Sequence, residues 1–164
     1  TANPHAVPSD RVIEKGDFVL MDYGAGYCDY RSDMTRTVVM GEPTPEQLDL
    51  YALVRRTHEE CVAAIHPGVE GNDIYKLSKK IIGDAGYGDY YNHGLGHGVG
   101  IDIHELPNFN RSKNTIEIGS VVTMEPGVYL PGVGGVRLED YGVVTENGYE
   151  PFTKTPHDLH VIDC

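Results

Sequence analysis

Cysteine, basic residues and long apolar runs are all scarce in this chain of 164 residues. Its three cysteines, Cys28, Cys61 and Cys164, are odd in number and far apart, and no CxxC pair occurs. This argues against a zinc ribbon or a disulfide framework and favours a reducing compartment. No apolar run is long enough for a membrane span and no signal-like pattern opens the chain, so we expect a soluble cytoplasmic protein.

The shortage of basic residues also limits the partners. Thirteen Lys and Arg stand against 25 Asp and Glu, for a formal net charge of −12. Binding to phosphates requires clustered cations, so neither nucleic acid nor an anionic membrane is expected as a partner. The length predicts one domain, large enough to form a core without disulfides.

The pattern of apolar residues predicts two helices grouped between two sets of strands. The first helix begins at Thr44, because Thr44-Pro45-Glu46-Gln47 combines an N-cap, an N1 proline and a capping box, and it ends at His66-Pro67-Gly68. The second begins near residue 72 or 73 and ends between residues 83 and 88. Strands are expected at 18–24, 27–30, 34–40, 120–125, 136–144 and 160–162, with the first of them antiparallel. This grouping indicates an α+β fold rather than alternating βαβ units.

Residues 92–104 contain three histidines and four glycines. Each glycine costs about 1 kcal/mol in a helix interior, so His93 and His97 match a zincin helix in spacing only, and no Glu follows His93. We expect a glycine-rich turn that lets the backbone approach a ligand, then an extended segment at 99–104 and a loop at 108–114. Histidines presented in this way suit metal binding or proton transfer, and a glycine-rich surface loop with incidental histidines is the alternative.

Four carboxylates lie within or at the ends of apolar strands: Asp22, Asp33, Glu125 and Glu139. A lone buried carboxylate is costly and is normally paired or bound to a metal. The alternative is that each merely caps a strand or pairs with Arg36 or Arg137. Four such carboxylates in an acidic chain make a cation the simplest common partner.

Carboxylates with one imidazole form an oxygen-rich ligand set. Such a set favours Mn²⁺, or Co²⁺ or Fe²⁺ in its place, over a thiolate zinc site. Because carboxylates can bridge, two divalent ions about 3.5–4 Å apart are plausible, and such a pair activates water and polarises a carbonyl or phosphoryl oxygen. These residues predict metal-assisted hydrolysis without choosing the bond.

The chain resembles the pita-bread (creatinase/aminopeptidase) metallopeptidases: methionine aminopeptidase, aminopeptidase P and prolidase. The resemblance rests on 21–25 (MDYGA), 32–37 (SDMTRT), the histidine stretch, 123–127 (TMEPG) and 137–140 (RLED), with Asp33 eleven residues after Asp22. It implies an antiparallel sheet with helices on one side. It also implies that residues 1–164 are a C-terminal catalytic domain, without the N-terminal domain and the start of the catalytic domain, and that the parent protein is a homodimer.

The resemblance also implies roles. Asp22 would chelate one metal ion, Asp33 and Glu139 would bridge both ions, and His97 and Glu125 would complete the other site. A bridging hydroxide would attack the scissile carbonyl while Glu125 shuttles a proton.

The other side chains that the resemblance singles out face the substrate. His104 would hydrogen-bond the tetrahedral intermediate or the substrate carbonyl, and His93 would contact the substrate backbone. His5, seventeen residues before Asp22, corresponds to a substrate-side histidine of the proline-cleaving members. Arg137 corresponds to an arginine that supports the site or the substrate.

Two features resemble the Xaa-Pro branch rather than methionine aminopeptidase. One is a histidine at position 93, and the other is the spacing of fourteen residues between Glu125 and Glu139. We therefore expect hydrolysis of the bond preceding proline in a proline-containing peptide, by an aminopeptidase P or a prolidase. The alternatives are a methionine aminopeptidase-like peptidase, a hydrolase acting on another bond, and a non-catalytic pita-bread module that binds peptides or proteins.

Several residues are expected to have no special role. His58 and His66 are predicted at a helix surface and a helix end, and His157 and His160 have no evident partners. The glycines at 94, 96 and 98 do not form a phosphate loop, because no apolar strand precedes them and no helix follows.

Overall fold

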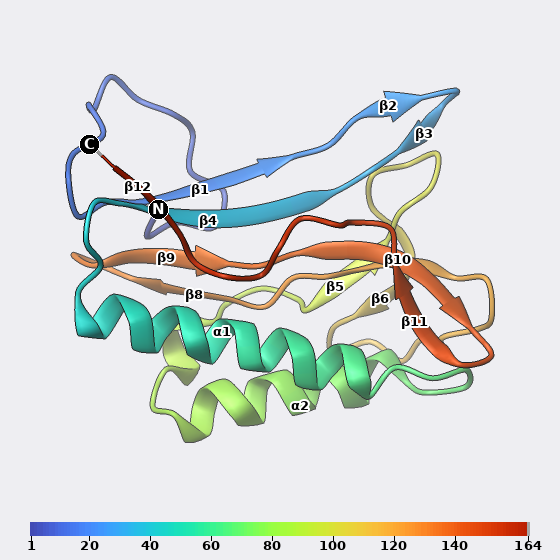
Figure 1. Ribbon diagram of the computed structural model, residues 1–164. Helices are drawn as coiled ribbons and strands as arrows, with labels where there is room; N and C mark the ends of the chain where they lie inside the picture. The colour runs from blue at the N-terminus through green and yellow to red at the C-terminus, as the bar shows by residue number, and fades with distance from the viewer. Residues whose placement is uncertain (164) are drawn as a thin grey trace.

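A computed structural model describes residues 1–163, in which two helices lie side by side along one side of several small β-sheets (Figure 1). The helices are α1 (Pro45–Ala63) and α2 (Gly71–Asp84), and a 3-10 turn, η1 (Gly88–Tyr90), follows them. The predicted α+β class is confirmed. Within the described residues, neither helix combines the length and apolar character that crossing a bilayer requires.

Helix α1 begins where its capping sequence predicts. The Thr44 hydroxyl accepts a hydrogen bond from the Gln47 amide at 3.2 Å, and the Gln47 side chain accepts one from the Thr44 amide at 2.9 Å. The buried face of α1 repeats every three or four residues through Leu50, Val54, Thr57, His58 and Cys61. His58 is thus on the core side, and the prediction of a surface position was wrong. Leu48 lies off this stripe and is 48% exposed.

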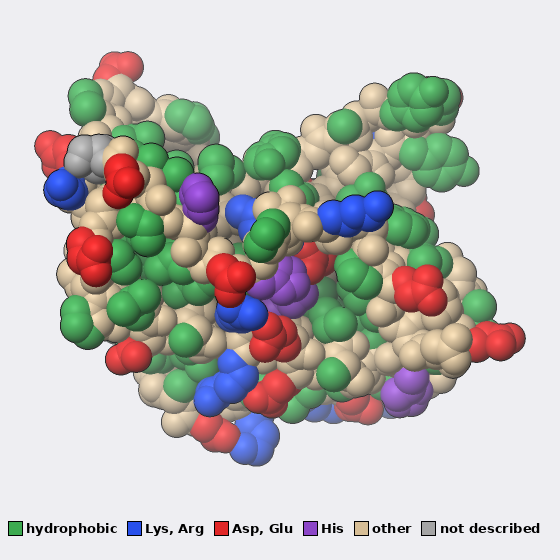
Figure 2. Space-filling model, viewed as in Figure 1, with side chains coloured by type: hydrophobic (Ala, Val, Ile, Leu, Met, Phe, Trp, Pro, Cys, Tyr) green, Lys and Arg blue, Asp and Glu red, His purple; other side chains and the backbone are tan. Residues whose placement is uncertain are grey.

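The first sheet has the strand order β1–β4–β12, from β1 (Phe18–Tyr23), β4 (Met34–Met40) and β12 (His160–Ile162). Strands β1 and β4 are antiparallel, as predicted, with Asp22 opposite Thr35, whereas β12 runs parallel to β4. Strands β2 (Gly26–Tyr27) and β3 (Tyr30–Arg31) form a hairpin that projects from this sheet (Figure 1). Figure 2 shows hydrophobic side chains at this projecting end, where Tyr27 is 80% exposed and Tyr30 62%.

The second sheet is antiparallel and five-stranded, in the order β11–β10–β7–β5–β6. Its strands are β5 (Gly96–Gly98), β6 (Glu105–Phe109), β7 (Val121–Met124), β10 (Asp140–Thr145) and β11 (Gly148–Pro151). A separate antiparallel pair is formed by β8 (Gly127–Leu130) and β9 (Gly134–Arg137).

Three predicted segments differ from the structure. The strand expected at 27–30 is interrupted by a turn at Cys28 and Asp29, which joins β2 to β3. The continuous strand at 136–144 is broken at Leu138 and Glu139, because the Glu139 backbone bonds to β4: its amide donates to Thr35 O at 3.0 Å and its carbonyl accepts from Arg36 Nη1 at 2.7 Å. The extended segment expected at 99–104 was also wrong. Residues 100–104 form bends between β5 and β6, and β6 includes two residues of the loop expected at 108–114.

The core consists of two groups of buried side chains beneath the helices. One joins Phe18, Leu50, Val54, Val128, Val136 and Leu138, from β1, α1, the β8–β9 pair and the link between β9 and β10. The other joins Ile74, Leu95, Phe109, Val122 and Met124, from α2 and the five-stranded sheet. The strands that carry the candidate site residues are therefore held in place by buried contacts to the two helices.

Candidate metal centre

All nine side chains singled out from the sequence line one cavity of about 460 Å³: His5, Asp22, Asp33, His93, His97, His104, Glu125, Arg137 and Glu139. They come from the N-terminal segment, β1, the start of β4, the histidine stretch, the end of β7 and the junction of β9 and β10. Strand ends that are far apart in the sequence therefore open into the same space.

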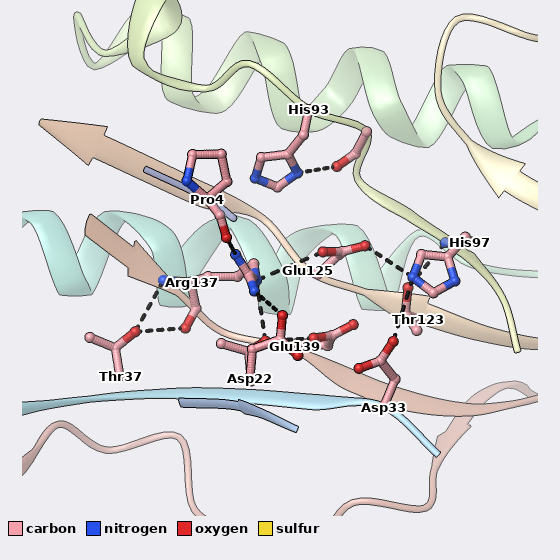
Figure 3. Close-up of polar contacts among 12 residues, drawn as sticks. Pro4, Asp22, Asp33, Thr37, His93, His97, Thr123, Glu125, Arg137 and Glu139 are labelled. Atoms are coloured by element: carbon pink, nitrogen blue, oxygen red, sulfur yellow. Dashed lines mark hydrogen bonds and ion pairs between the residues drawn. The ribbon is translucent and has the colours of Figure 1, made fainter. Parts of the chain in front are cut away.

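Asp33, His97 and Glu139 form the centre of the cluster. Each presents a potential ligand atom, and these atoms all lie within 4.8 Å of one another. His97 Nε2 lies 3.7 Å from Asp33 Oδ2 and 3.4 Å from Glu125 Oε1 (Figure 3). The spacing suits side chains that share a cation, because it is longer than a hydrogen bond.

The His97 ring is oriented by its own strand. Its Nδ1 lies 3.0 Å from the Gly98 carbonyl oxygen, which can only accept, so Nδ1 carries the proton. Nε2 then presents a lone pair toward the carboxylates, as in metal sites where the second ring nitrogen is held by a carbonyl. The His97 amide donates to Thr123 Oγ1 at 3.0 Å, which ties β5 to β7.

Glycine is required beside His97 because two backbones meet there. A Cβ at Gly96 would lie 2.2 Å from the Thr123 carbonyl oxygen. The close approach at Gly96 is therefore to a neighbouring strand. Since Leu95, Gly96, Gly98 and Val99 are buried, the alternative of an incidental surface loop is wrong for this part of the stretch.

Burial of several carboxylates makes the cavity favourable for a cation. Burial, with repulsion from Asp22, raises the pKa of Asp33 to about 6, and burial with repulsion from Asp33 and Asp22 raises the pKa of Glu125 to about 8. Burial, with repulsion from Glu125 and Asp33, also raises the pKa of Glu139 well above its usual range. A divalent ion would offset this repulsion, so the residues fit the oxygen-rich metal site expected from their chemistry.

Arg137 is the cation that the chain itself supplies to this cavity. Its Nη2 donates to Asp22 Oδ2 at 2.5 Å and its Nε lies 3.8 Å from Glu125 Oε2 (Figure 3). The alternative that an arginine pairs with a strand carboxylate is thus confirmed for Asp22. Arg36 instead pairs with Asp140 at 2.7 Å, away from the cavity.

Two hydroxyl groups that we did not predict hold the site residues. Tyr129 OH accepts from Arg137 Nη1 at 2.9 Å and lies 3.0 Å from His93 Nε2. Thr35 Oγ1 donates to Glu139 Oε2 at 2.6 Å. Thr35 was detectable, because it lies two residues after Asp33 and therefore faces the same side of the strand. The sequence indicated Tyr129 only weakly, as a residue with a polar hydroxyl group within an apolar segment.

The remaining predicted residues border the cavity. His104 lies against the metal-facing histidine, with 4.2 Å between its ring centroid and that of His97. His5 is exposed in the N-terminal segment, and the neighbouring Pro4 carbonyl accepts from Arg137 Nη1 at 3.1 Å. Both imidazoles can therefore reach a molecule bound in the cavity.

This fold and cavity define an α+β protein with a candidate divalent-metal site of carboxylates and histidine. The model of metallopeptidase family M24 matches residues 1–146, and the chain belongs to that family. It is 45% identical, over 97% of its length and 46% of the relative's, to an Xaa-Pro dipeptidase of Pyrococcus furiosus. The predicted family resemblance is confirmed.

Solved structures show the same fold. The prolidase from Pyrococcus horikoshii OT3 superposes with a TM-score of 0.93 at 43% identity, covering 96% of this chain and 46% of that one. The X-Pro aminopeptidase from Thermotoga maritima MSB8 does so with a TM-score of 0.94 at 36% identity, covering 98% and 46%. The predicted pita-bread fold is confirmed, and the chain spans about 46% of the length of these relatives.

Proposed function

We propose that this chain supplies the catalytic site of a metallopeptidase that hydrolyses the peptide bond preceding proline. The observation that carries the proposal is the convergence of Asp33, His97 and Glu139 on one point of a cavity that also contains Glu125. The substrate class is supported by relatives described as Xaa-Pro dipeptidase, prolidase and X-Pro aminopeptidase.

We propose that five residues hold two divalent ions, with Mn²⁺ preferred and Co²⁺ or Fe²⁺ as substitutes: Asp22, Asp33, His97, Glu125 and Glu139. Such ions, when bound, supply Lewis-acid activation of water and of the scissile carbonyl. For Asp22 to take part, its carboxylate must turn from Arg137 or share its oxygens with it, which is feasible because the Asp22 side chain is 42% exposed.

The side chains around the ligands divide the remaining tasks. Glu125, whose Oε1 lies 3.4 Å from His97 Nε2 in the ligand cluster, is placed to take a proton from the attacking water and pass it on, which suits a proton shuttle. His104 can donate to an oxygen on the substrate carbonyl. His93 and His5 would orient the peptide, and Arg137 would fix Asp22 and balance its charge.

The test combines metal binding with peptide hydrolysis. Mn²⁺ binding to the EDTA-treated chain is measured by calorimetry, followed by hydrolysis of Ala-Pro, Ala-Pro-Ala and, as controls, Ala-Ala-Ala and Met-Ala-Ala. We expect two ions per chain and proline-dependent cleavage, with the ratio of dipeptide to tripeptide rates separating prolidase from aminopeptidase P.

Asp33→Asn is the matched variant, because it keeps the shape of the side chain while removing its charge. We expect it to lose both metal binding and activity. Ion binding with cleavage only of Met-Ala-type peptides would favour the methionine aminopeptidase-like alternative. Metal binding without any cleavage contradicts the proposal for this chain and favours the peptide-binding module.

A further inference from the structure

A second cluster of potential ligands lies away from the cavity. It consists of His58 on α1, Asp140 at the start of β10 and His157 in the segment that leads to β12. Their ligand atoms all lie within 4.8 Å of one another, and none of the three lines the cavity described above. In Figure 1 the segment with His157 runs between β4 and α1 in the view, and Figure 2 shows histidine side chains reaching the surface of that face.

His58 is the anomalous member of this cluster. It is 2% exposed, and neither ring nitrogen has a hydrogen-bond partner among residues 1–163. A buried polar group without a partner costs about 1–3 kcal/mol, so such groups are rare in folded proteins. A neutral imidazole carries one proton, so one of the two unpartnered ring nitrogens has a free lone pair. That ring faces the other two members, with Nε2 3.4 Å from Asp140 Oδ2.

Asp140 offers the cluster one of its two oxygens. Oδ1 accepts hydrogen bonds from Arg36 Nη2 at 2.7 Å and from Thr153 Oγ1 at 2.5 Å. Oδ2 faces the histidines, 2.6 Å from His157 Nε2. The carboxylate is therefore fixed from behind by two donors, the arrangement that orients a metal-ligating carboxylate. The charge of Arg36 weakens attraction for a cation, and Oδ2 is held by the 2.6 Å hydrogen bond with His157 Nε2, which a bound ion would replace.

The His157 ring is the third member of the cluster and lies against the His58 ring. Its centroid lies 4.9 Å from that of His58, with the rings at 72°. Its side chain is 26% exposed, whereas those of His58 and Asp140 are 3% and 4% exposed. An ion can therefore enter past His157, and solvent can supply a fourth ligand on that side.

We propose that His58, Asp140 and His157 bind one divalent transition-metal ion of the zinc type, separate from the carboxylate-rich cavity. Two imidazoles and one carboxylate suit Zn²⁺, which accepts three protein ligands and a water in a tetrahedral site. The bound ion would join α1, β10 and the segment after β11. It would thus stabilise the chain directly after Glu139 without contacting the substrate cavity.

The test compares Zn²⁺ stoichiometry in matched histidine variants. The EDTA-treated wild type, His157→Ala and the control His160→Ala are dialysed against Zn²⁺, and bound zinc per chain is measured by atomic absorption. We expect His157→Ala to retain one ion fewer per chain, and His160→Ala, which is exposed in the same segment, to match the wild type. We also expect Zn²⁺ to raise the melting temperature less in His157→Ala. Equal stoichiometry in all three proteins would overturn the proposal.

A measurement on the wild type keeps the proposal testable if His157→Ala does not fold. The nitrogen resonances of the imidazole rings are recorded by NMR while Zn²⁺ is added, and His58→Gln is used to assign the His58 signals. We expect Nε2 of both His58 and His157 to move to the range of zinc-bound nitrogen. If neither moves at saturating Zn²⁺, the two histidines form only a local packing and hydrogen-bond group, and the proposal fails.

Discussion

Thr35 and Glu139 are joined by a buried hydrogen bond of 2.6 Å between side chains 104 residues apart in the sequence. Their backbones also meet, since the Glu139 amide donates to Thr35 O at 3.0 Å. Thr35 is fully buried and Glu139 is 2% exposed. Arg137 Nε donates to the same Thr35 hydroxyl at 3.2 Å, so this hydroxyl links the arginine of the cavity to its most deeply buried carboxylate.

Thr35→Val tests whether this hydroxyl supports metal binding. Valine keeps the shape but removes the donor to Glu139, and the loss of such a supporting hydrogen bond typically lowers metal affinity about 10–100-fold. We expect a fall of that size in Mn²⁺ affinity by calorimetry. Thr35→Ser keeps a hydroxyl and should remain close to the wild type. Equal Mn²⁺ affinities for the valine and serine variants would show that the bond does not orient Glu139.

Glu139→Gln should affect stability and metal binding in opposite directions. The glutamine can still accept from Thr35, but it removes one charge from a group of carboxylates whose pKa values burial and mutual repulsion raise. At pH 8 in EDTA we therefore expect a higher melting temperature than that of the wild type, together with a loss of Mn²⁺ binding. Glu146→Gln, at an exposed turn, is the control and should change neither quantity. A destabilised Glu139→Gln chain would contradict the repulsion argument.

Gly96→Ala tests the close contact of β5 with β7. The added Cβ would lie 2.2 Å from Thr123 O, so the strands must separate, and such overpacking typically costs about 1–3 kcal/mol. We expect that loss in the free energy of unfolding by urea titration, and weaker metal binding because His97 is the next residue. Gly83→Ala is the control: its Cβ would have open space in α2, and we expect a gain of about 0.5–1 kcal/mol. Similar effects at the two positions would be incompatible with a specific strand contact.

Cys28 and Cys61 should differ strongly in reactivity. Cys28 is exposed, whereas Cys61 is fully buried on α1, and burial raises the pKa of its thiol to about 12. Because the thiolate is the reactive form, raising the pH from 7 to 9 should leave Cys61 unmodified by iodoacetamide in the folded chain. Peptide mapping by mass spectrometry before and after unfolding measures this, with Cys28 as the internal reference. Modification of Cys61 at the rate of Cys28 would show that the helix opens locally.

Elements whose signals are contained within a few residues could be predicted from the sequence. The start of α1 depends on Thr44 and Gln47, three residues apart, and the structure forms their reciprocal bonds. Strands β1 and β4 follow from apolar and β-branched runs, and Asp22 and Asp33 are recognisable because they interrupt or border such runs. The set of candidate ligands was likewise visible, since carboxylates and histidines in apolar or glycine-rich contexts are chemically distinctive.

Pairings between distant segments were decided only by the tertiary structure. The break at Leu138 and Glu139 exists because Glu139 bonds to β4, and nothing within 136–144 indicates it. The pairing of Asp22 with Arg137 depends in the same way on which strands become neighbours. His58, predicted at a surface, is buried because the segment after β11 covers that face of α1. Local sequence thus determined element types and donor chemistry, whereas partners were set by long-range packing, whose contacts leave no periodic signal along the chain.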